Sequence, residues 1–276
     1  GKVARRARVL DVCRRCDVRA CQRGSEKGWA CPWGLCVGQI DENTDCGLCT
    51  ECLKTCPYDN VALRWRPFAL ETVIRGSGEA WLAMVMLVTA VAYCVIHLGH
   101  WPLVRDCVNV LDKGNGGPFA VYAAVLWGVA LVGLPAVMGL VAAAGKRLAR
   151  APQSTAAVLI ASTAALIPLG LAVWIALVVP LLSVNATFVL QSLSDPFGWG
   201  WDFLGTANTP WHQLWPGAVP WVQVACVLIG LGYGLRAAWR VWLGLVTRPQ
   251  AALRGTVPLA MLLAGVSCWL IFFFAD

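Results

Sequence analysis

Charged residues are scarce in this chain. Only 13% of its 276 residues are Asp, Glu, Lys or Arg, and 58% are hydrophobic. Soluble domains carry about 25% charged residues. The deficit is uneven, because residues 1–79 hold 13 of the 22 Lys and Arg and 10 of the 15 Asp and Glu. The rest of the chain is nearly free of charge, which excludes an ordinary soluble domain there.

Several motifs that carry chemistry are also missing. The chain contains no GxxxxGK[ST], no GxSxG and no GxGxxG sequence, which argues against a nucleotide-phosphate loop, a hydrolase nucleophile and a dinucleotide fingerprint. We therefore expect that the protein itself makes and breaks no substrate bonds. The net charge of +7 comes without a nucleic-acid motif, so we assign it to membrane topology and contact with anionic lipid.

Cysteine, by contrast, is abundant. Nine of the 13 cysteines lie between Cys13 and Cys56, and the last four follow the pattern Cys46-x2-Cys49-x2-Cys52-x3-Cys56-Pro57. This spacing is that of the bacterial ferredoxin run, which binds [4Fe–4S] clusters. Paired cysteines also form zinc sites and disulfides, but three cysteines at this interval before a Cys-Pro are typical of iron–sulfur loops.

Two clusters require eight thiolates, and the first half of the run supplies a similar order of ligands with longer spacers. In ferredoxins the fourth ligand of each run binds the other cluster. The sequence thus predicts one cluster on Cys13, Cys16, Cys21 and Cys56, and a second on Cys31, Cys46, Cys49 and Cys52. Cys36 is left over, either as a spare thiol or as a substitute for one of the widely spaced ligands, with Cys21 the least secure.

The remaining sequence contains five apolar stretches, and a membrane-spanning helix needs about 20 apolar residues. They cover residues 80–98, 119–144, 155–182, 221–246 and 257–274. The predicted fold is mostly α: a polytopic membrane bundle of about five transmembrane helices (80–276) after an N-terminal bacterial-ferredoxin-like two-cluster domain (1–79). Pro168 is expected to kink the third span.

The turns between the spans alternate in charge. Positive residues mark the head and every second turn, whereas 183–219 has no Lys or Arg; the positive side chains of these turns are Lys146, Arg147, Arg150, Arg236, Arg240, Arg248 and Arg254. The positive-inside rule then places the head in the cytoplasm and the C-terminus outside, in a bacterial inner membrane. Arg236 and Arg240 fall within the fourth span, where they either snorkel to the inner headgroups or face inward with a functional role.

The outer loop 183–220 is long and rich in tryptophan, including Trp199, Trp201, Trp211 and Trp215. One interpretation is an aromatic belt on an interfacial stretch that rests on the outer leaflet. The other is an outward-facing docking surface or quinol pocket.

The chain has three histidines, His97, His100 and His212. Haem between helices takes ligands from opposite sides, and His97 and His100 are three residues apart on one helix. Interfacial or proton-handling roles are therefore preferred, with haem or quinone contacts as the alternative.

Some segments resemble a known family. They are Cys31-Pro32-Trp33, residues 43–57 (NTDCGLCTECLKTCP), Asn60-Val61-Ala62-Leu63, Arg66-Pro67-Phe68 and residues 195–201 (DPFGWGW). They look like bacterial membrane-bound 4Fe-4S polyferredoxins, distantly related to the NapH, NosR and CcoG types. In that family the cluster domain follows further spans, so we expect the basic start, residues 2–8, to flank an earlier span. Cys36 departs from the family pattern.

The resemblance implies a membrane-bound electron-transfer subunit. Electrons would pass between a cytoplasmic or quinol donor and a partner redox protein, with other redox subunits or a soluble carrier as partners. A second hypothesis, favoured by the Trp-rich loop and His212, is a quinol dehydrogenase subunit. A third is an accessory of a metal-uptake or permease system. The last is weakly supported, since no Asp, Glu or Lys lies mid-span.

Overall fold

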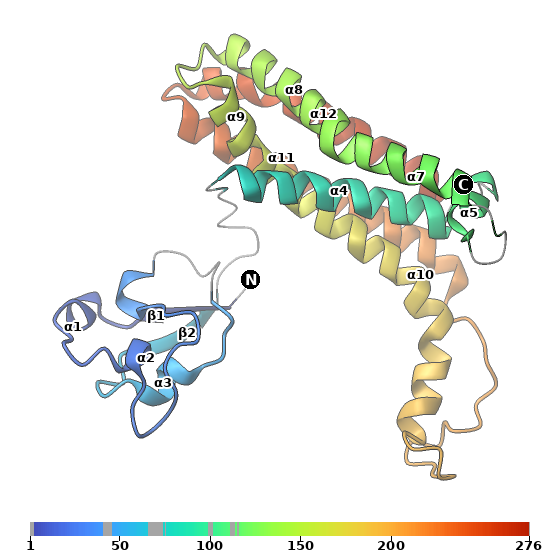
Figure 1. Ribbon diagram of the computed structural model, residues 1–276, viewed down its shortest axis with the longest axis horizontal. Coiled ribbons are helices and arrows are strands. Elements are labelled where there is room, and N and C mark those ends of the chain that lie inside the picture. The colour runs from blue at the N-terminus through green and yellow to red at the C-terminus, as the bar shows by residue number, and fades with distance from the viewer. Residues whose placement is uncertain are drawn as a thin grey trace. The chain divides into compact units, whose positions relative to one another are not determined.

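The computed structural model describes residues 3–40, 46–65, 74, 76–98, 102–110, 114 and 116–275 (Figure 1). The chain forms two compact units, Gly1–Glu71 and Thr72–Asp276, here called the Cys-rich unit and the helical unit. The helical unit includes residues 72–79, which the composition had grouped with the head, because its first long helix already begins at Ser77.

The Cys-rich unit is built around a two-stranded antiparallel sheet. Strand β1 (Val3–Ala7) pairs with β2 (Val61–Trp65), with Val3 opposite Trp65 and Ala7 opposite Val61. The long connection between the strands carries four short helical elements, α1 (Leu10–Arg14), α2 (Ala20–Arg23), η1 (Val37–Gln39) and α3 (Glu51–Thr55). Such short helices are not stable alone, so their positions depend on what they pack against.

These elements pack against a core made of cysteines and apolar side chains. The buried residues of this unit's core are Ala7, Val37, Cys52 and Val61, with Cys13, Cys21, Leu53 and Cys56 packed around them. A unit of this size buries little apolar surface. Its core and its cysteine site are therefore built from the same residues.

The helical unit consists of long apolar helices. In order they are α4 (Ser77–Leu98), α5 (Pro102–Val108), α7 (Gly116–Gly128), the π-helical turn η2 (Val129–Gly133), α8 (Leu134–Ala149), α9 (Thr155–Ser162), the 3₁₀ turn η3 (Thr163–Ala165), α10 (Leu166–Ser194), the 3₁₀ turn η4 (Pro216–Ala218), α11 (Val219–Leu245) and α12 (Pro249–Ala275). Within the described residues, five segments are long and apolar enough to cross a membrane: Ser77–Leu98, Gly116–Ala149, Thr155–Ser194, Pro216–Leu245 and Pro249–Ala275. The predicted mostly helical, five-span character is confirmed, and the chain is suited to a multi-pass membrane protein.

Close packing in this unit depends on glycine. α10 packs on α11 and α4, α11 on α12, and α12 on α8. Trp242 of α11 is only 1% exposed, and its indole ring fills the space beside Gly145 of α8 and Gly255 of α12. A Cβ atom at Gly145 would lie 2.5 Å from this ring. Small residues at such contacts let helices approach closely where lipid provides no hydrophobic driving force.

The third span differs from its predicted form. The interruption expected at Pro168 lies just before that residue, in η3, since proline has no N–H for the carbonyl four residues earlier. α10 continues to Ser194, beyond residue 182, where the predicted third span ends. Residues 183–194 of the predicted outer loop are therefore helix.

A second proline, Pro180, lies inside α10. It has no N–H to donate to the Ala176 carbonyl. The Gln223 Nε2 of α11 donates to that carbonyl instead, over 3.0 Å, and Gln223 is only 5% exposed. An unpaired carbonyl would be costly in an apolar surrounding, so this side chain completes the backbone pairing at the proline.

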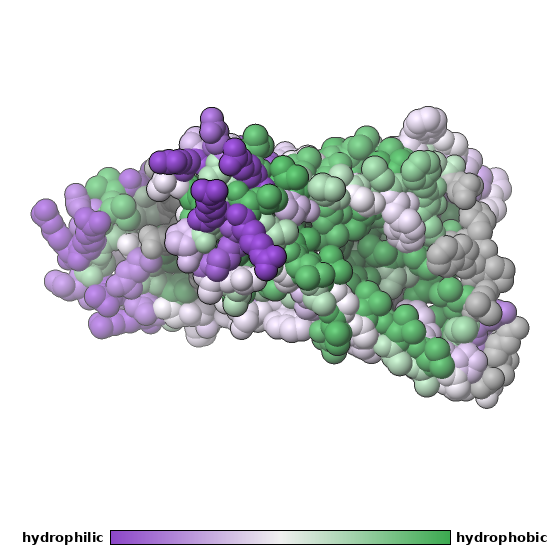
Figure 2. All heavy atoms as spheres, turned by 90° about the horizontal axis from the view of Figure 1, so that it is seen from above, coloured by the Kyte–Doolittle hydropathy of each residue, from purple (hydrophilic) through white to green (hydrophobic). Residues whose placement is uncertain are grey.

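The outside of the helical unit is broadly apolar. Figure 2 shows hydrophobic side chains over much of the unit's visible face. Large exposed side chains include Leu140 of α8 and Phe272 of α12. This surface is the one expected for helices in contact with lipid.

We expect Gln223→Leu to lower the free energy of unfolding by about 1–3 kcal/mol, because it leaves the buried Ala176 carbonyl without a donor. The matched control is the same change combined with Pro180→Ala, in which the restored N–H at position 180 donates to that carbonyl. The double variant should regain most of the lost stability, as measured by chemical unfolding in detergent. Equal losses in the two variants would contradict this role for Gln223.

Candidate cysteine site

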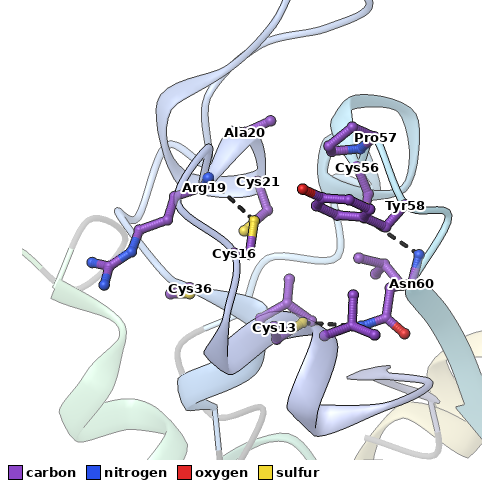
Figure 3. A pocket seen from close by; sticks show the side chains of 13 residues that line it. Cys13, Cys16, Arg19, Ala20, Cys21, Cys36, Cys56, Pro57, Tyr58 and Asn60 are labelled. Carbon is purple, nitrogen blue, oxygen red and sulfur yellow. Dashed lines mark hydrogen bonds between the residues drawn. The ribbon is translucent and has the colours of Figure 1, made fainter.

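Five cysteines line one pocket of the Cys-rich unit (Figure 3). They come from α1 and the turn after it, from α2, from the residue before η1 and from the end of α3: Cys13, Cys16, Cys21, Cys36 and Cys56. All five are free thiols. The structure thus brings together the four cysteines predicted for the first cluster, and it adds Cys36 to them.

Three of these sulfur atoms accept hydrogen bonds from nitrogen. The Arg19 backbone N–H donates to Cys16 Sγ over 3.4 Å, and the Asn60 backbone N–H donates to Cys56 Sγ over 3.3 Å. The side chain of Asn60 donates through Nδ2 to Cys13 Sγ over 3.2 Å. N–H groups that point at sulfur stabilise negative charge on it.

Asn60, which directly precedes β2, is held in place by the two residues that follow β1. Its Nδ2 also donates to the Val9 carbonyl over 2.8 Å, and its Oδ1 accepts from the Val9 N–H over 2.9 Å. Its own carbonyl accepts from the Arg8 N–H over 2.8 Å. Asn60 is 5% exposed, so a fully bonded and buried amide positions the donor at Cys13.

The two halves of the unit share a local conformation at their third cysteine. Cys21 is the second residue of α2, which follows Arg19 in the left-handed region at φ 47°. Cys52 is likewise the second residue of α3, which follows Thr50 in the same region at φ 65°. A non-glycine residue with positive φ is uncommon, so the repeated turn indicates that Cys21 corresponds to Cys52. Cys36 has no counterpart of this kind and instead precedes η1.

Burial and crowding act on the thiols of the pocket. Burial raises the pKa of the Cys13 thiol, the Asn60 hydrogen bond lowers it, and the nearby Cys56, Cys36 and Cys16 raise it further. Burial also raises the pKa of the Cys21 thiol, opposed by the Val37 backbone N–H and reinforced by Cys36. These two thiols therefore favour the protonated form by themselves, and a bound cation would have to displace their protons.

The second predicted quartet is less clearly assembled. Cys31 and Cys52 are buried, Cys46 is half-buried and Cys49 is exposed, and none of the four lines the pocket of Figure 3. Cys46 Sγ accepts from the Leu48 backbone N–H over 3.4 Å. Residues 41–45, which precede this run, lie outside the described residues.

The segment around Cys31 nevertheless lies against the second run. The Trp29 N–H donates to Glu51 Oε2 of α3 over 3.1 Å. Trp33 Nε1 lies 2.9 Å from where a Cβ atom of Gly47 would be, so a larger residue at position 47 would require this indole to shift. Contacts on both sides of Cys31 thus hold its segment next to the loop of Cys46, Cys49 and Cys52.

A site for a single metal ion is not formed. Among the described residues, no three His, Cys, Asp or Glu side chains are grouped so that they could hold one ion. Tetrahedral zinc needs ligands that converge to about 2.3 Å from one atom.

The histidines lie apart from the cysteines. His97 is exposed near the end of α4, and its ring stacks on Tyr93 at 5.5 Å. His212 is exposed, with Nδ1 3.2 Å from the Pro210 carbonyl oxygen. His100 lies outside the described residues. These contacts give no support to the haem or quinone interpretation.

The sequence reasoning missed the donors around the sulfur atoms. Asn60 appeared only as part of a resembling segment, and its contact with Cys13 spans 47 residues. Arg19 was not singled out, although its position two residues before Cys21 matches Thr50 before Cys52. The signal available in the sequence was that Arg19 and Thr50 each lie two residues before the third cysteine of their half.

Comparison of the chain with protein-family models, with curated proteins and with solved structures found no match. The interpretation of the site therefore depends on its own geometry and chemistry.

Proposed function

We propose that the Cys-rich unit holds two [4Fe–4S] clusters and that the protein is a membrane-bound electron-transfer subunit. The observation that carries the proposal is the pocket in which five thiols meet and three sulfur atoms accept N–H hydrogen bonds. Thiolates supplied by Cys-x2-Cys loops, with amide donors around the sulfur atoms, are the surroundings of such clusters.

The first cluster would be held by Cys13, Cys16, Cys21 and Cys56. Each thiolate of a cluster binds a different iron, so the sulfur atoms need not converge on one point, which fits thiols that border a pocket without forming a single-ion site. The turn shared by Cys21 and Cys52 favours Cys21 over Cys36 as the third ligand.

The second cluster would be held by Cys31, Cys46, Cys49 and Cys52. The contacts of Trp29 with Glu51 and of Trp33 with Gly47 support this exchange of ligands between the two halves. Together the two quartets reproduce the ferredoxin arrangement in which the last cysteine of each run serves the other cluster.

When bound, each cluster supplies reversible one-electron transfer. The residues of the chain would set how easily this occurs. Asn60 and Arg19 place N–H donors at Cys13, Cys56 and Cys16, which favours the more negative, reduced state. Apolar side chains limit water around the sulfur atoms, namely Val12, Val37 and Val61.

The five apolar helical segments would fix this unit to a bilayer. Lys146, Arg147 and Arg248 lie at the helix ends on the side from which α4 starts, and the positive-inside rule assigns that side to the cytoplasm of a bacterial inner membrane. The redox partner would be a soluble carrier or another redox subunit. The quinol dehydrogenase and metal-uptake hypotheses gain no specific support, because His97 and His212 contact Tyr93 and Pro210.

Removal of one ligand tests the assignment. We expect Cys56→Ala and Cys13→Ala each to lose about four iron atoms and the matching acid-labile sulfide per chain, since both would serve the first cluster. Cys36→Ala is the matched control, because Cys36 lines the same pocket, and it should keep the full iron content. Iron and sulfide analysis of the anaerobically purified full chain provides the measurement.

Two outcomes would sink this assignment. A wild-type preparation that contains zinc and no sulfide would refute the clusters. Full iron in Cys21→Ala together with loss of a cluster in Cys36→Ala would show that Cys36, and not Cys21, is the third ligand.

The donor on Asn60 gives a second test. Asn60→Asp keeps the shape and the acceptor for the Val9 N–H but replaces the N–H at Cys13 by a carboxylate oxygen. We expect the midpoint potential of one cluster to fall by at least about 50 mV, because a lost hydrogen bond of about 1 kcal/mol and the added negative charge both disfavour the reduced state. Redox titration followed by EPR spectroscopy measures this.

The other cluster acts as the internal reference in that titration, since the Asn60 side chain donates to Cys13, a proposed ligand of the first cluster. An unchanged pair of potentials at full iron content would show that the amide does not act on the cluster.

A further inference from the structure

The helical segment that ends in α10 is longer than a bilayer crossing requires. The continuous apolar segment Thr155–Ser194 has 40 residues. At about 1.5 Å per residue this is about 60 Å, roughly twice the hydrocarbon thickness. α11 starts only at Val219, and its Gln223 bonds the Ala176 carbonyl of α10. Val219 therefore lies about as far along the bundle as Pro180. The turns of α10 beyond Pro180 therefore extend past the start of α11.

These last turns of α10 turn away from the bundle, and the chain returns beside them in a loop (Figure 1). The hairpin so formed comprises residues 181–215. Pro180 lies at its base, where the Ala176 carbonyl is bonded by Gln223. A change of helix direction at a proline has a physical cause in the lost backbone bond.

Four polar side chains of the hairpin helix face the return loop. Ser183, Thr187, Gln191 and Ser194 follow each other at helical spacing, so they lie on one stripe. Thr187 Oγ1 donates to the His212 carbonyl over 2.6 Å, and Ser194 Oγ donates to Asp202 Oδ1 over 2.7 Å. Ser183 Oγ and Gln191 Nε2 donate to the carbonyls of Leu214 and Thr209.

The opposite face of the hairpin helix is exposed and mostly apolar; its two polar side chains are Ser192 and Asn185, whose Nδ2 donates to the Leu181 carbonyl of the same helix. Its exposed apolar side chains include Leu182, Val184, Phe188, Val189, Leu190 and Leu193. No charged residue occurs between Arg150 and Asp195. The hairpin thus directs its large apolar side chains outward and four of its polar side chains toward the return loop, the reverse of what is expected for a protein segment in water.

The tip of the hairpin presents an ordered group of aromatic rings. The Asp195 carboxylate accepts the N–H groups of Trp199 and Gly200, each over 2.9 Å. Hydrogen bonds from Ser194 and from the Ala207 backbone lower the pKa of Asp202. The Asp195 and Asp202 carboxylates thus both accept hydrogen bonds from groups of the hairpin itself. Within this turn Phe197 stacks on Trp199 at 4.8 Å, and Trp201 meets Trp199 edge-on at 4.8 Å.

We propose that the hairpin 181–215 lies on the bilayer surface at the end of the bundle where α4 and α12 finish, with its apolar face and aromatic tip in the boundary between headgroups and acyl chains. The proposal is independent of the clusters. Its occupant is lipid, because the exposed apolar face continues the lipid-facing surface of the spans and offers no charge to orient a protein partner. Tryptophan is the side chain favoured at this depth.

Photo-crosslinking in native membranes tests the occupant. Phe188, 48% exposed on the helix, and Phe197 at the tip are each replaced by p-benzoylphenylalanine in the full chain. Phe272→p-benzoylphenylalanine, at a 77% exposed position of α12, is the positive control for lipid. Trp29→p-benzoylphenylalanine, at an 82% exposed position in the Cys-rich unit, serves as the comparison outside the helices.

We expect lipid adducts at positions 188 and 197 with yields within about twofold of that at position 272, as mass spectrometry measures them. Adducts to another protein would identify a docking surface and overturn the proposal, and adducts to a second copy of the chain would overturn it as well. Absence of any adduct at both positions, with a normal lipid yield at position 272, would place the hairpin in water. If the variant at position 188 does not fold, the one in the exposed tip decides.

Discussion

The structure depends on one constraint: polar groups that are removed from water must find partners within the chain. Two side-chain amides meet this constraint where the backbone alone cannot. Gln223 bonds the Ala176 carbonyl that Pro180 leaves without a donor. Asn60 bonds Val9 in both directions and gives its remaining N–H groups to sulfur. In lipid or in a small core, an unpaired group of this kind costs more than most single contacts contribute.

In the Cys-rich unit the same constraint joins stability to the proposed chemistry. Four of the eight residues in or against its core are cysteines, and the helices that present them have four or five residues. Such a unit gains little from apolar burial alone. Cluster binding would then supply part of the free energy of folding, as it does in other small metal-binding domains. Because the pKa values of the Cys13 and Cys21 thiols are raised, the removal of their protons is a cost that cluster binding must overcome.

The sequence predicts the helical unit well because lipid imposes length and composition on each span, and both are local properties. It does not predict how far the helix of the third span extends, for the same reason. Hydropathy falls at Ser183, but the helix continues because Ser183, Thr187 and Gln191 pair with carbonyls of a loop that returns from about 20 to 30 residues later. That pairing is not visible until the path of the loop is known. Pro168 and Pro180 look alike in sequence, and only the neighbour Gln223 distinguishes the second.

The cysteine site shows a similar division. Spacing brings Cys13, Cys16 and Cys21 together through local turns, whereas the approach of Cys56 and Asn60 requires the pairing of β1 with β2 across more than 50 residues. Spacing favours Cys21 over Cys36 only weakly, since Cys21 also departs from the regular interval. The left-handed turns at Arg19 and Thr50 also favour Cys21, because a strained backbone conformation repeated before the third cysteine of each half marks equivalent positions. Cys36 then belongs to the longer connection of the first half, close to the pocket but outside the repeat that would hold the iron.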